Sequence, residues 1–300
     1  LDGSITLDNK EKICGFLEHQ GMRDCKPVRR PLTKEDLMAM VNTSNEVLNT
    51  AGIRKYKAII GEANWLSQTT HPTLATATSV LAGYSSAPTE ASTPVMQHFM
   101  RYWQHAKDYA LANIPGNNEG LTVESDSDWA GLYTAVGEVR SRTGTLIKYN
   151  GMPVAWISKL QKCLGTSLKP EMEDEVDSGD LDLFEIATSS AGAELHAAAD
   201  SLKLAMHIHH LAEELNIPVS DTIIMKVDST AAIGKIQGPR GSGKMKHLDL
   251  RDAWIQRHRN KKIVNIVKVL GTENGADFFT KLLSRAEFCR EEERLMTKLD

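Results

Sequence analysis

Residues 189–202, SSAGAELHAAADSL, begin a stretch with the apolar spacing of an amphipathic helix. Glu194 lies on the apolar face of this expected helix, together with three residues further along: Ala198, Leu202 and Ala205. A carboxylate that points into a protein core is costly unless a nearby group compensates its charge. We expect a helix from about residue 190 to 215, ended by Asn216 and Pro218, in which Glu194 needs a compensating partner.

The segments around this helix predict a sheet. DTIIMKVDS (221–229) is a nearly continuous apolar run, typical of a strand buried on both faces. GLTVESDSDWAG (120–131) alternates like a strand, and GTLIKYNGMPVAWISKL (144–160) is typical of a hairpin that turns at Asn150-Gly151. Beyond residue 229 we expect a short helix, a basic helix, a strand and a final helix, in the ranges 230–238, 244–262, 263–271 and 275–296. This order predicts an α/β domain, with helices on the faces of a mixed sheet.

The first part of the chain has a different character. After a short opening strand, the apolar periodicity predicts only helices, in the ranges 10–22, 34–42, 54–84 and 94–111, with two separate helical segments, 56–68 and 74–84, within the third range. We therefore expect two parts: a mostly helical segment over residues 1–117 and the α/β domain over residues 118–300.

Composition limits the class of protein. An apolar fraction of 41% and a charged fraction of 25% are ordinary for a soluble globular chain. We find no apolar run long enough to span a membrane and no signal-peptide pattern. Because the first residue is not Met, we expect a piece of a longer protein. The four cysteines lack metal-ligand spacing, which favours a reduced, intracellular protein.

The net charge of −4 conceals two charged blocks. Residues 171–185 carry eight acids and no Lys or Arg, as in a solvated loop. Residues 235–262 carry nine Lys or Arg against two Asp, which indicates a surface that faces nucleic-acid phosphates. A solvated helix face without a partner is the alternative. The candidate nucleic-acid-binding residues are Arg240, Lys244, Lys246, His247, Arg251, Arg257 and Arg259.

Four acids stand at the ends of otherwise apolar elements: Asp126, Glu194, Asp228 and Asp277. Asp126 and Asp228 end strands, whereas Glu194 and Asp277 open helices. If these ends meet at one sheet edge, the carboxylates repel one another unless cations hold them. Ligands that are all oxygen suit Mg²⁺ or Mn²⁺, and two such ions form a phosphodiester-cleaving arrangement. Each acid also has a structural interpretation, as a turn residue or as a group that complements a helix N-terminus.

Two further motifs are weaker. GPRGSGK (238–244) matches the letters of a nucleotide-binding loop, but Met245 replaces the required Ser or Thr and a helix precedes it, so we expect no nucleotide cofactor. His207 and His210 have the spacing of zinc ligands on one helix, but no Cys or acid stands nearby, so an exposed helix side is favoured.

Seven motifs occur in an order that resembles the ribonuclease H domain of copia-type LTR retrotransposon polyproteins: SDSDWAG, RSRTG, VAWISKLQ, ATSSAGAELHAA, VDSTAAI, KHLDLR and GADFFTK. Upstream, YKAIIGEANWLSQTTHPTLATATSVL (56–81) and RYWQHAKDYAL (101–111) look like the thumb end and connection that follow a polymerase palm. The polymerase Y-x-D-D loop does not occur in this sequence, so we expect no polymerase active site within it.

The resemblance implies a ribonuclease H-like, mixed five-stranded sheet flanked by helices and preceded by a mostly helical connection segment. It implies Mg²⁺-dependent hydrolysis of the RNA strand of RNA–DNA hybrids, with two Mg²⁺ ions or with Mn²⁺. Asp126, Glu194, Asp228 and Asp277 would be both catalytic and metal-binding. Asp126 would bridge both ions, Asp277 would help to hold the ion that activates water, and Glu194 and Asp228 would help to hold the other.

The same resemblance implies an upstream polymerase domain as partner, no contact with a membrane, and a cytoplasmic (virus-like particle) or nuclear location. The sequence departs from the family where about 25 residues, including the acidic run, separate SKLQ from ATSS. This insertion motivates an alternative, a degenerate copy that folds and binds nucleic acid without cleaving it. A third class, an integrase of the DDE type or another nuclease of the same fold, would cleave duplex DNA instead.

Overall fold

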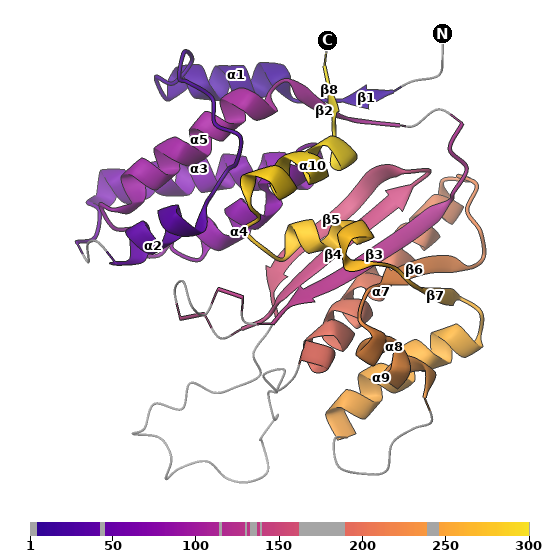
Figure 1. Cartoon of the computed structure of the whole chain (residues 1–300). Helices are drawn as coiled ribbons and strands as arrows, with labels where there is room; N and C mark the ends of the chain where they lie inside the picture. The colour runs from indigo at the N-terminus through magenta and orange to yellow at the C-terminus, as the bar shows by residue number, and fades with distance from the viewer. Residues whose placement is uncertain are drawn as a thin grey trace, which may run out of the picture.

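The computed structural model describes residues 5–42, 46–113, 116–129, 131–132, 137–138, 140–161, 190–238 and 246–299, with side chains undescribed over 246–250. A five-stranded mixed sheet forms its centre (Figure 1). The strands are β3 (Leu121–Asp128), β4 (Arg142–Tyr149), β5 (Met152–Leu160), β6 (Ile223–Val227) and β7 (Val264–Lys268), in the order β5-β4-β3-β6-β7. β3, β4 and β5 are antiparallel, whereas β6 and β7 run parallel to β3. The expected mixed five-stranded sheet flanked by helices is confirmed.

The hairpin between β4 and β5 turns where the sequence predicts it. Asn150 and Gly151 both have positive φ, 48° and 81°, as a two-residue turn of the mirror-image type requires. Asn150 Oδ1 also accepts a hydrogen bond of 2.9 Å from the backbone N–H of Gly120, which places the turn beside the start of β3.

Three helices cover one face of the sheet: α7 (Ser190–Glu214), α8 (Thr230–Gln237) and α9 (Lys246–Asn260) (Figure 1). Their apolar faces share a core with β3, β6 and β7, in which Leu195, Val123 and Met225 are fully buried. α7 confirms the expected long helix, and Asn216 ends it in a left-handed conformation with φ of 56°.

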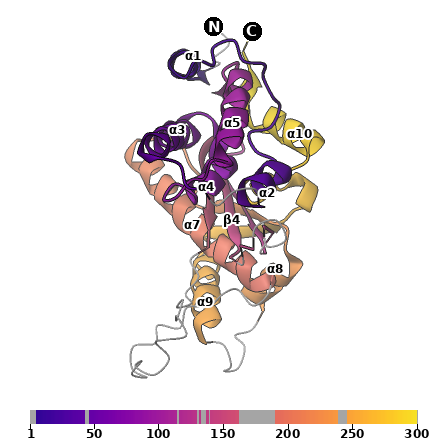
Figure 2. The same cartoon turned by 90° about the vertical axis from the view of Figure 1, so that its left-hand side faces the viewer.

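The first part of the chain packs against the opposite face. It contains β1 (Thr6–Leu7), α1 (Lys10–His19), α2 (Lys34–Asn42), α3 (Thr50–Thr69), η1 (Pro72–Leu74), α4 (Ala75–Ala82), α5 (Ser92–Ala106) and β2 (Tyr109–Ala112). Figure 2 shows α1 and α5 at one end of the molecule and α9 at the other. A second core joins Phe99 and Trp103 of α5 to Trp156 of β5.

One helix prediction in this part is wrong in extent. The two helical segments predicted within 54–84 correspond to α3 and α4, and the break between them lies at Thr70 and His71, because Pro72 cannot continue the hydrogen-bond ladder of α3 and instead begins η1. The helix predicted over 94–111 ends at Ala106, because residues 109–112 pair instead with β1 and with β8 (Thr297–Lys298).

The final helix predicted over 275–296 is two separate elements. η4 (Gly275–Phe279) follows η3 (Gly271–Glu273), and α10 (Arg285–Leu295) begins only after Ser284. Ser284 and Glu287 form a reciprocal capping box that starts α10 at this point. Asp277 therefore lies inside a short 3₁₀ helix and does not open the last α-helix.

Candidate active site

Three of the candidate acids meet at one edge of the sheet. Asp126 lies near the carboxyl end of β3, Asp228 directly follows the parallel neighbour β6, and Glu194 lies in the first turns of α7. Each offers a carboxylate oxygen, and these oxygens lie within 4.8 Å of one another. The carboxyl ends of parallel neighbours lie at the same sheet edge, and α7 packs across β3, so the third acid arrives beside the first two.

Burial sets the electrostatics of this acid triad (Asp126, Glu194 and Asp228). Asp126 is 3% exposed, and burial raises its pKa to about 6, although Lys281 acts in the opposite direction. Glu194 is 6% exposed, and burial followed by the charges of Asp126 and Asp228 raises its pKa to about 9. Three acids this close disfavour full ionisation unless a cation joins them.

One atom points directly to such a cation. Glu194 Oε2 is buried and has no hydrogen-bond partner among the described residues. A buried carboxylate oxygen without a partner is expensive, and the ligands here are all oxygen, as Mg²⁺ and Mn²⁺ prefer. The triad therefore fits a divalent cation, which would supply the compensating partner that the sequence required for Glu194.

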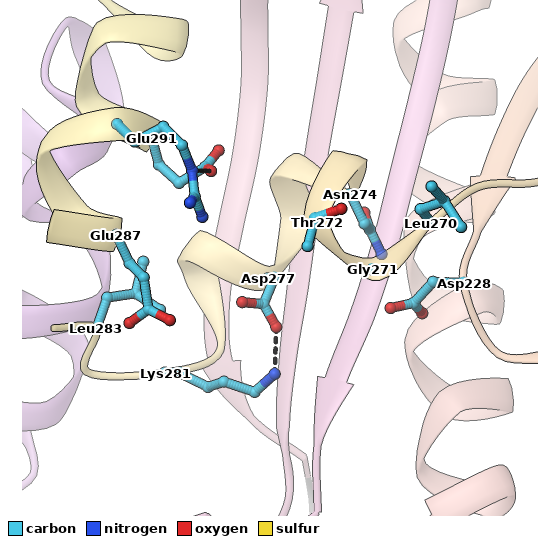
Figure 3. A pocket seen from close by; sticks show the side chains of 11 residues that line it. Asp228, Leu270, Gly271, Thr272, Asn274, Asp277, Lys281, Leu283, Glu287 and Glu291 are labelled. Carbon is cyan, nitrogen blue, oxygen red and sulfur yellow. Dashed lines mark hydrogen bonds and ion pairs between the residues drawn. The ribbon is translucent and has the colours of Figure 1, made fainter.

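Asp277 is placed differently. It lies outside the group of oxygens within 4.8 Å, and its carboxylate forms an ion pair with Lys281 Nζ. Asp277, Lys281 and Asp228 line one cavity of about 480 Å³, in which Asp277 and Asp228 lie on either side of the η3–η4 segment (Figure 3). Its assignment as a fourth metal ligand stays a prediction.

The 3₁₀ helix η4 is fastened to β3 at both of its ends. Gly275 N–H donates to Glu124 Oε2 at 2.7 Å, and the Thr280 hydroxyl donates to Asp126 Oδ2 at 2.7 Å. Gly144 of β4 leaves the room for this approach, because a Cβ there would lie 2.3 Å from the carbonyl oxygen of Ala276. The two hydrogen bonds hold η4 in one position along β3.

Sequence reasoning missed Glu124, which is 2% exposed and forms an ion pair with Lys148 Nζ at 3.0 Å. An acid at an inward position of an apolar strand, two residues before Asp126, was the available signal.

Gln161 is a second missed residue. Its side-chain amide donates to Ser127 Oγ at 3.1 Å, to Thr143 Oγ1 at 3.2 Å and to the carbonyl oxygen of Ala193 at 2.9 Å. It therefore joins the end of β3, which carries Asp126, to the turn of α7 that carries Glu194. Its signal in the sequence is its place as the last residue of the VAWISKLQ motif (154–161).

The predicted nucleic-acid residues are only partly described. Arg251, Arg257 and Arg259 lie on α9, which packs against α7 and α8. Lys246 and His247 begin that helix, with their side chains undescribed, and Arg240 and Lys244 lie outside the described residues. Most of GPRGSGK and the whole acidic run 171–185 also lie outside them. The nucleic-acid surface stays a prediction.

The histidine pair on α7 gathers no metal ligands. His207 and His210 are exposed, and within the described part of the chain only the acid triad brings three potential ligand atoms within 4.8 Å of one another.

Comparison with known proteins shows which proteins this chain resembles. No family model matches it. Over 292 residues, 96% of the chain, it is 26% identical to the "Retrovirus-related Pol polyprotein from transposon TNT 1-94" of Nicotiana tabacum. Its homologues are retrovirus-related Pol polyproteins from plant transposons. The chain spans 20% of the length of the Nicotiana tabacum polyprotein.

Two more similarities accompany this one. Over 120 residues, 40% of the chain, the protein is 34% identical to the "Secreted RxLR effector protein 161" of Plasmopara viticola, and it covers 80% of that protein. A solved N-terminal RNase H domain of rv2228c from Mycobacterium tuberculosis aligns with 58% of the chain and 96% of its own chain, at 12% identity and a TM-score of 0.31. Among the described helices, none combines the length and apolar character that a membrane crossing requires.

Proposed function

We propose that this chain hydrolyses the RNA strand of RNA–DNA hybrids as the ribonuclease H part of a copia-type retrotransposon Pol polyprotein. The observation that carries the proposal is the acid triad, with a buried Glu194 oxygen that lacks a partner. In this proposal residues 118–300 form the ribonuclease H-like domain, and residues 1–117 form a thumb and connection-like segment that follows the polymerase domain of the same polyprotein. As part of such a polyprotein, the chain would act inside the cell.

The residues of the triad would hold Mg²⁺, or Mn²⁺, with Asp277 as a further ligand. Two bound ions would activate a water molecule and stabilise the leaving oxygen of the phosphodiester. The chain itself supplies orientation: the Thr280 hydroxyl holds one oxygen of Asp126, and the backbone of Ser127 provides a hydrogen bond that favours the ionised form of Glu194.

The substrate would be recognised by shape. The cationic side chains of α9 would contact phosphates of the hybrid, so binding should weaken strongly as the salt concentration rises. Selectivity for RNA would come from contacts to 2′-hydroxyl groups across the minor groove, without base reading.

Asp228→Asn tests the metal-dependent function. The variant removes one ligand charge from the half-buried end of β6 and should lose detectable cleavage of an RNA–DNA hybrid in Mg²⁺, with an unchanged circular dichroism spectrum. The matched control is Asp221→Asn, which changes an exposed aspartate just before the same strand and should cleave normally. Equal cleavage by Asp228→Asn and the unchanged protein would refute the assignment.

The same cleavage assay distinguishes the proposed enzyme from the alternative, a degenerate copy that binds nucleic acid without cleaving it. A non-catalytic copy would bind the hybrid, in a salt-dependent manner, and would release no product at any Mg²⁺ or Mn²⁺ concentration. An integrase-type or other nuclease would cut duplex DNA and leave the hybrid intact.

A further inference from the structure

One cation is built into the acidic site. Lys281 Nζ forms an ion pair with Asp277, and the preceding residue, Thr280, donates its hydroxyl hydrogen bond to Asp126. Two consecutive residues after η4 therefore direct a donor to two different acids. Figure 3 shows the Lys281 side chain extended toward Asp277 along the wall of the cavity that Asp228 also lines.

The charge of Lys281 also affects acids other than its direct partner, Asp277. This charge opposes the rise in the pKa of Asp126 and of Glu194. Burial acts to lower the pKa of Lys281, and the carboxylates of Asp277, Asp126 and Asp128 raise it.

Two other cations near the site, Arg142 and Lys268, are directed elsewhere. Arg142 Nη1 donates to Ser79 Oγ at 2.7 Å and to Ser158 Oγ at 3.3 Å, and so it joins β4 to α4 and β5. Lys268 Nζ donates to the backbone carbonyl oxygen of Asp228 and leaves the carboxylate of that residue free of this contact. Lys281 is therefore the cation best placed to balance the carboxylates.

We propose that Lys281 is the resident counter-ion of the acidic site and competes with divalent metal for it. The inference rests on the proposed function, because it assumes that the acids are metal ligands. Without metal, the ammonium group balances the carboxylates and keeps η4 against β3. When a divalent ion enters, the ammonium leaves Asp277 and moves into the adjoining cavity of about 480 Å³, which is open enough to receive it. Lys281 thus weakens metal binding and stabilises the metal-free protein.

Binding of Mn²⁺, followed by electron paramagnetic resonance, tests the competition without an activity assay. Lys281→Met removes the charge and keeps much of the side-chain volume, so it should bind Mn²⁺ about 5- to 10-fold more tightly than the unchanged protein. Lys281→Arg keeps the charge and should bind Mn²⁺ within about 2-fold of the unchanged protein. The same Lys281→Met variant should melt at a lower temperature in EDTA and regain its stability in Mn²⁺.

Lys159→Met is the matched control. Lys159 forms an ion pair with Asp200, and its side chain is 48% exposed, close to the 44% of Lys281, but it lies on β5 outside the acid triad. Removal of the Lys159 charge should leave the affinity for Mn²⁺ unchanged. If Lys281→Met is unfolded in EDTA, Lys281→Gln provides a second neutral variant, and both can be measured downward from the Mn²⁺-saturated state.

The outcomes separate this inference from the proposed function. If Lys281→Met and Lys281→Gln bind Mn²⁺ no more tightly than the unchanged protein, the counter-ion role is overturned, even though hybrid cleavage persists. If the unchanged protein binds Mn²⁺ and the Lys281 variants bind it more tightly, but no hybrid is cleaved, the counter-ion role holds and the proposed function fails. If the unchanged protein binds no Mn²⁺, both are overturned.

Discussion

The buried carboxyl group of Glu194 lowers the stability of the folded protein. Its carboxyl group is buried beside Asp126 and Asp228, and one of its oxygens has no hydrogen-bond partner in the described part of the chain. Such a group costs stability on the order of 1–3 kcal/mol, and a protein retains it where a ligand repays the cost. The acid triad therefore costs stability, and binding of a cation there would offset that cost.

The buried His71 should make the stability of the folded protein depend on pH. Burial lowers the pKa of His71 to about 4, although its ring nitrogen lies 3.2 Å from the carbonyl oxygen of Ala106. Between pH 6.5 and about 4 the unfolded chain binds a proton at this position and the folded chain does not, so stability should fall as the pH falls through this window. The loss should reach at most about 3 kcal/mol.

Urea unfolding from pH 7.5 down to 4.5 measures this effect. His71→Gln has no proton to bind and should show a flatter decline, whereas His19→Gln changes an exposed histidine on α1 and should follow the unchanged protein. Parallel profiles for all three proteins would show that His71 does not set the acid response.

At the scale of elements, the position of η4 depends on close contact between backbones. Because η4 is short, it cannot hold itself in place, and its fastening to Glu124 and Asp126 requires that no side chain stand on β4 beneath it. Gly144 satisfies this requirement. The orientation of Asp277 toward the site is therefore decided by a residue on a neighbouring strand.

Gly144→Ala tests this dependence. The added Cβ would meet the Ala276 carbonyl oxygen at 2.3 Å and Thr280 Cγ2 at 2.6 Å, so η4 must shift away from β4. We expect a loss of about 1–3 kcal/mol in the free energy of unfolding and weaker binding of Mn²⁺. Gly61→Ala is the control: it lies within α3 with nothing within 4 Å of its Cβ and should stabilise by about 0.5–1 kcal/mol. Equal stability of the two variants would contradict the close packing of η4.

The sequence predicted correctly those elements that depend on turn residues, apolar spacing or short motifs. The Asn150-Gly151 turn, the length of α7 and the meeting of Asp126, Glu194 and Asp228 all follow from spacing and turn chemistry or from the motif resemblance. The break between η4 and α10 was missed, because the apolar periodicity continues through it while the capping box at Ser284 starts a new helix.

Other features depend on partners far away in the sequence. β2 leaves the helical pattern to pair with β8, and its pairing Tyr109–Lys298 joins residues from opposite parts of the chain. Gln161 likewise reaches the carbonyl oxygen of Ala193, more than thirty residues further along the chain. Periodicity within a segment contains no information on such contacts.

At the scale of the whole molecule, the two parts share a core. Phe278, Phe279, Phe288 and Leu295 of the C-terminal elements belong to the same apolar cluster as the N-terminal helices. The Tyr102 hydroxyl of α5 donates to Glu292 of α10 at 2.6 Å, and His105 lies 2.9 Å from the same carboxylate. The elements that follow the acid triad are thus packed against the first hundred residues of the chain.

This shared core predicts that the α/β part depends on the helical part. A fragment of residues 118–300 would expose the apolar side chains of η4 and α10 and leave β8 without its partner strand. We expect it to melt at a lower temperature than the full chain and to bind the dye ANS, and we expect the full chain to unfold in one transition. A fragment as stable as the full chain would show that the two parts are independent.

The hydrogen bonds of the Gln161 side chain affect how well the protein tolerates changes in the sequence that follows it. Its amide donates to the carbonyl oxygen of Ala193, so the described residues on either side of segment 162–189 are linked directly to each other. A direct link of this kind between the two flanking positions makes the scaffold less dependent on the sequence that separates them. Evolution can therefore lengthen, shorten or recharge the chain between these two positions while the geometry of the acid triad is preserved.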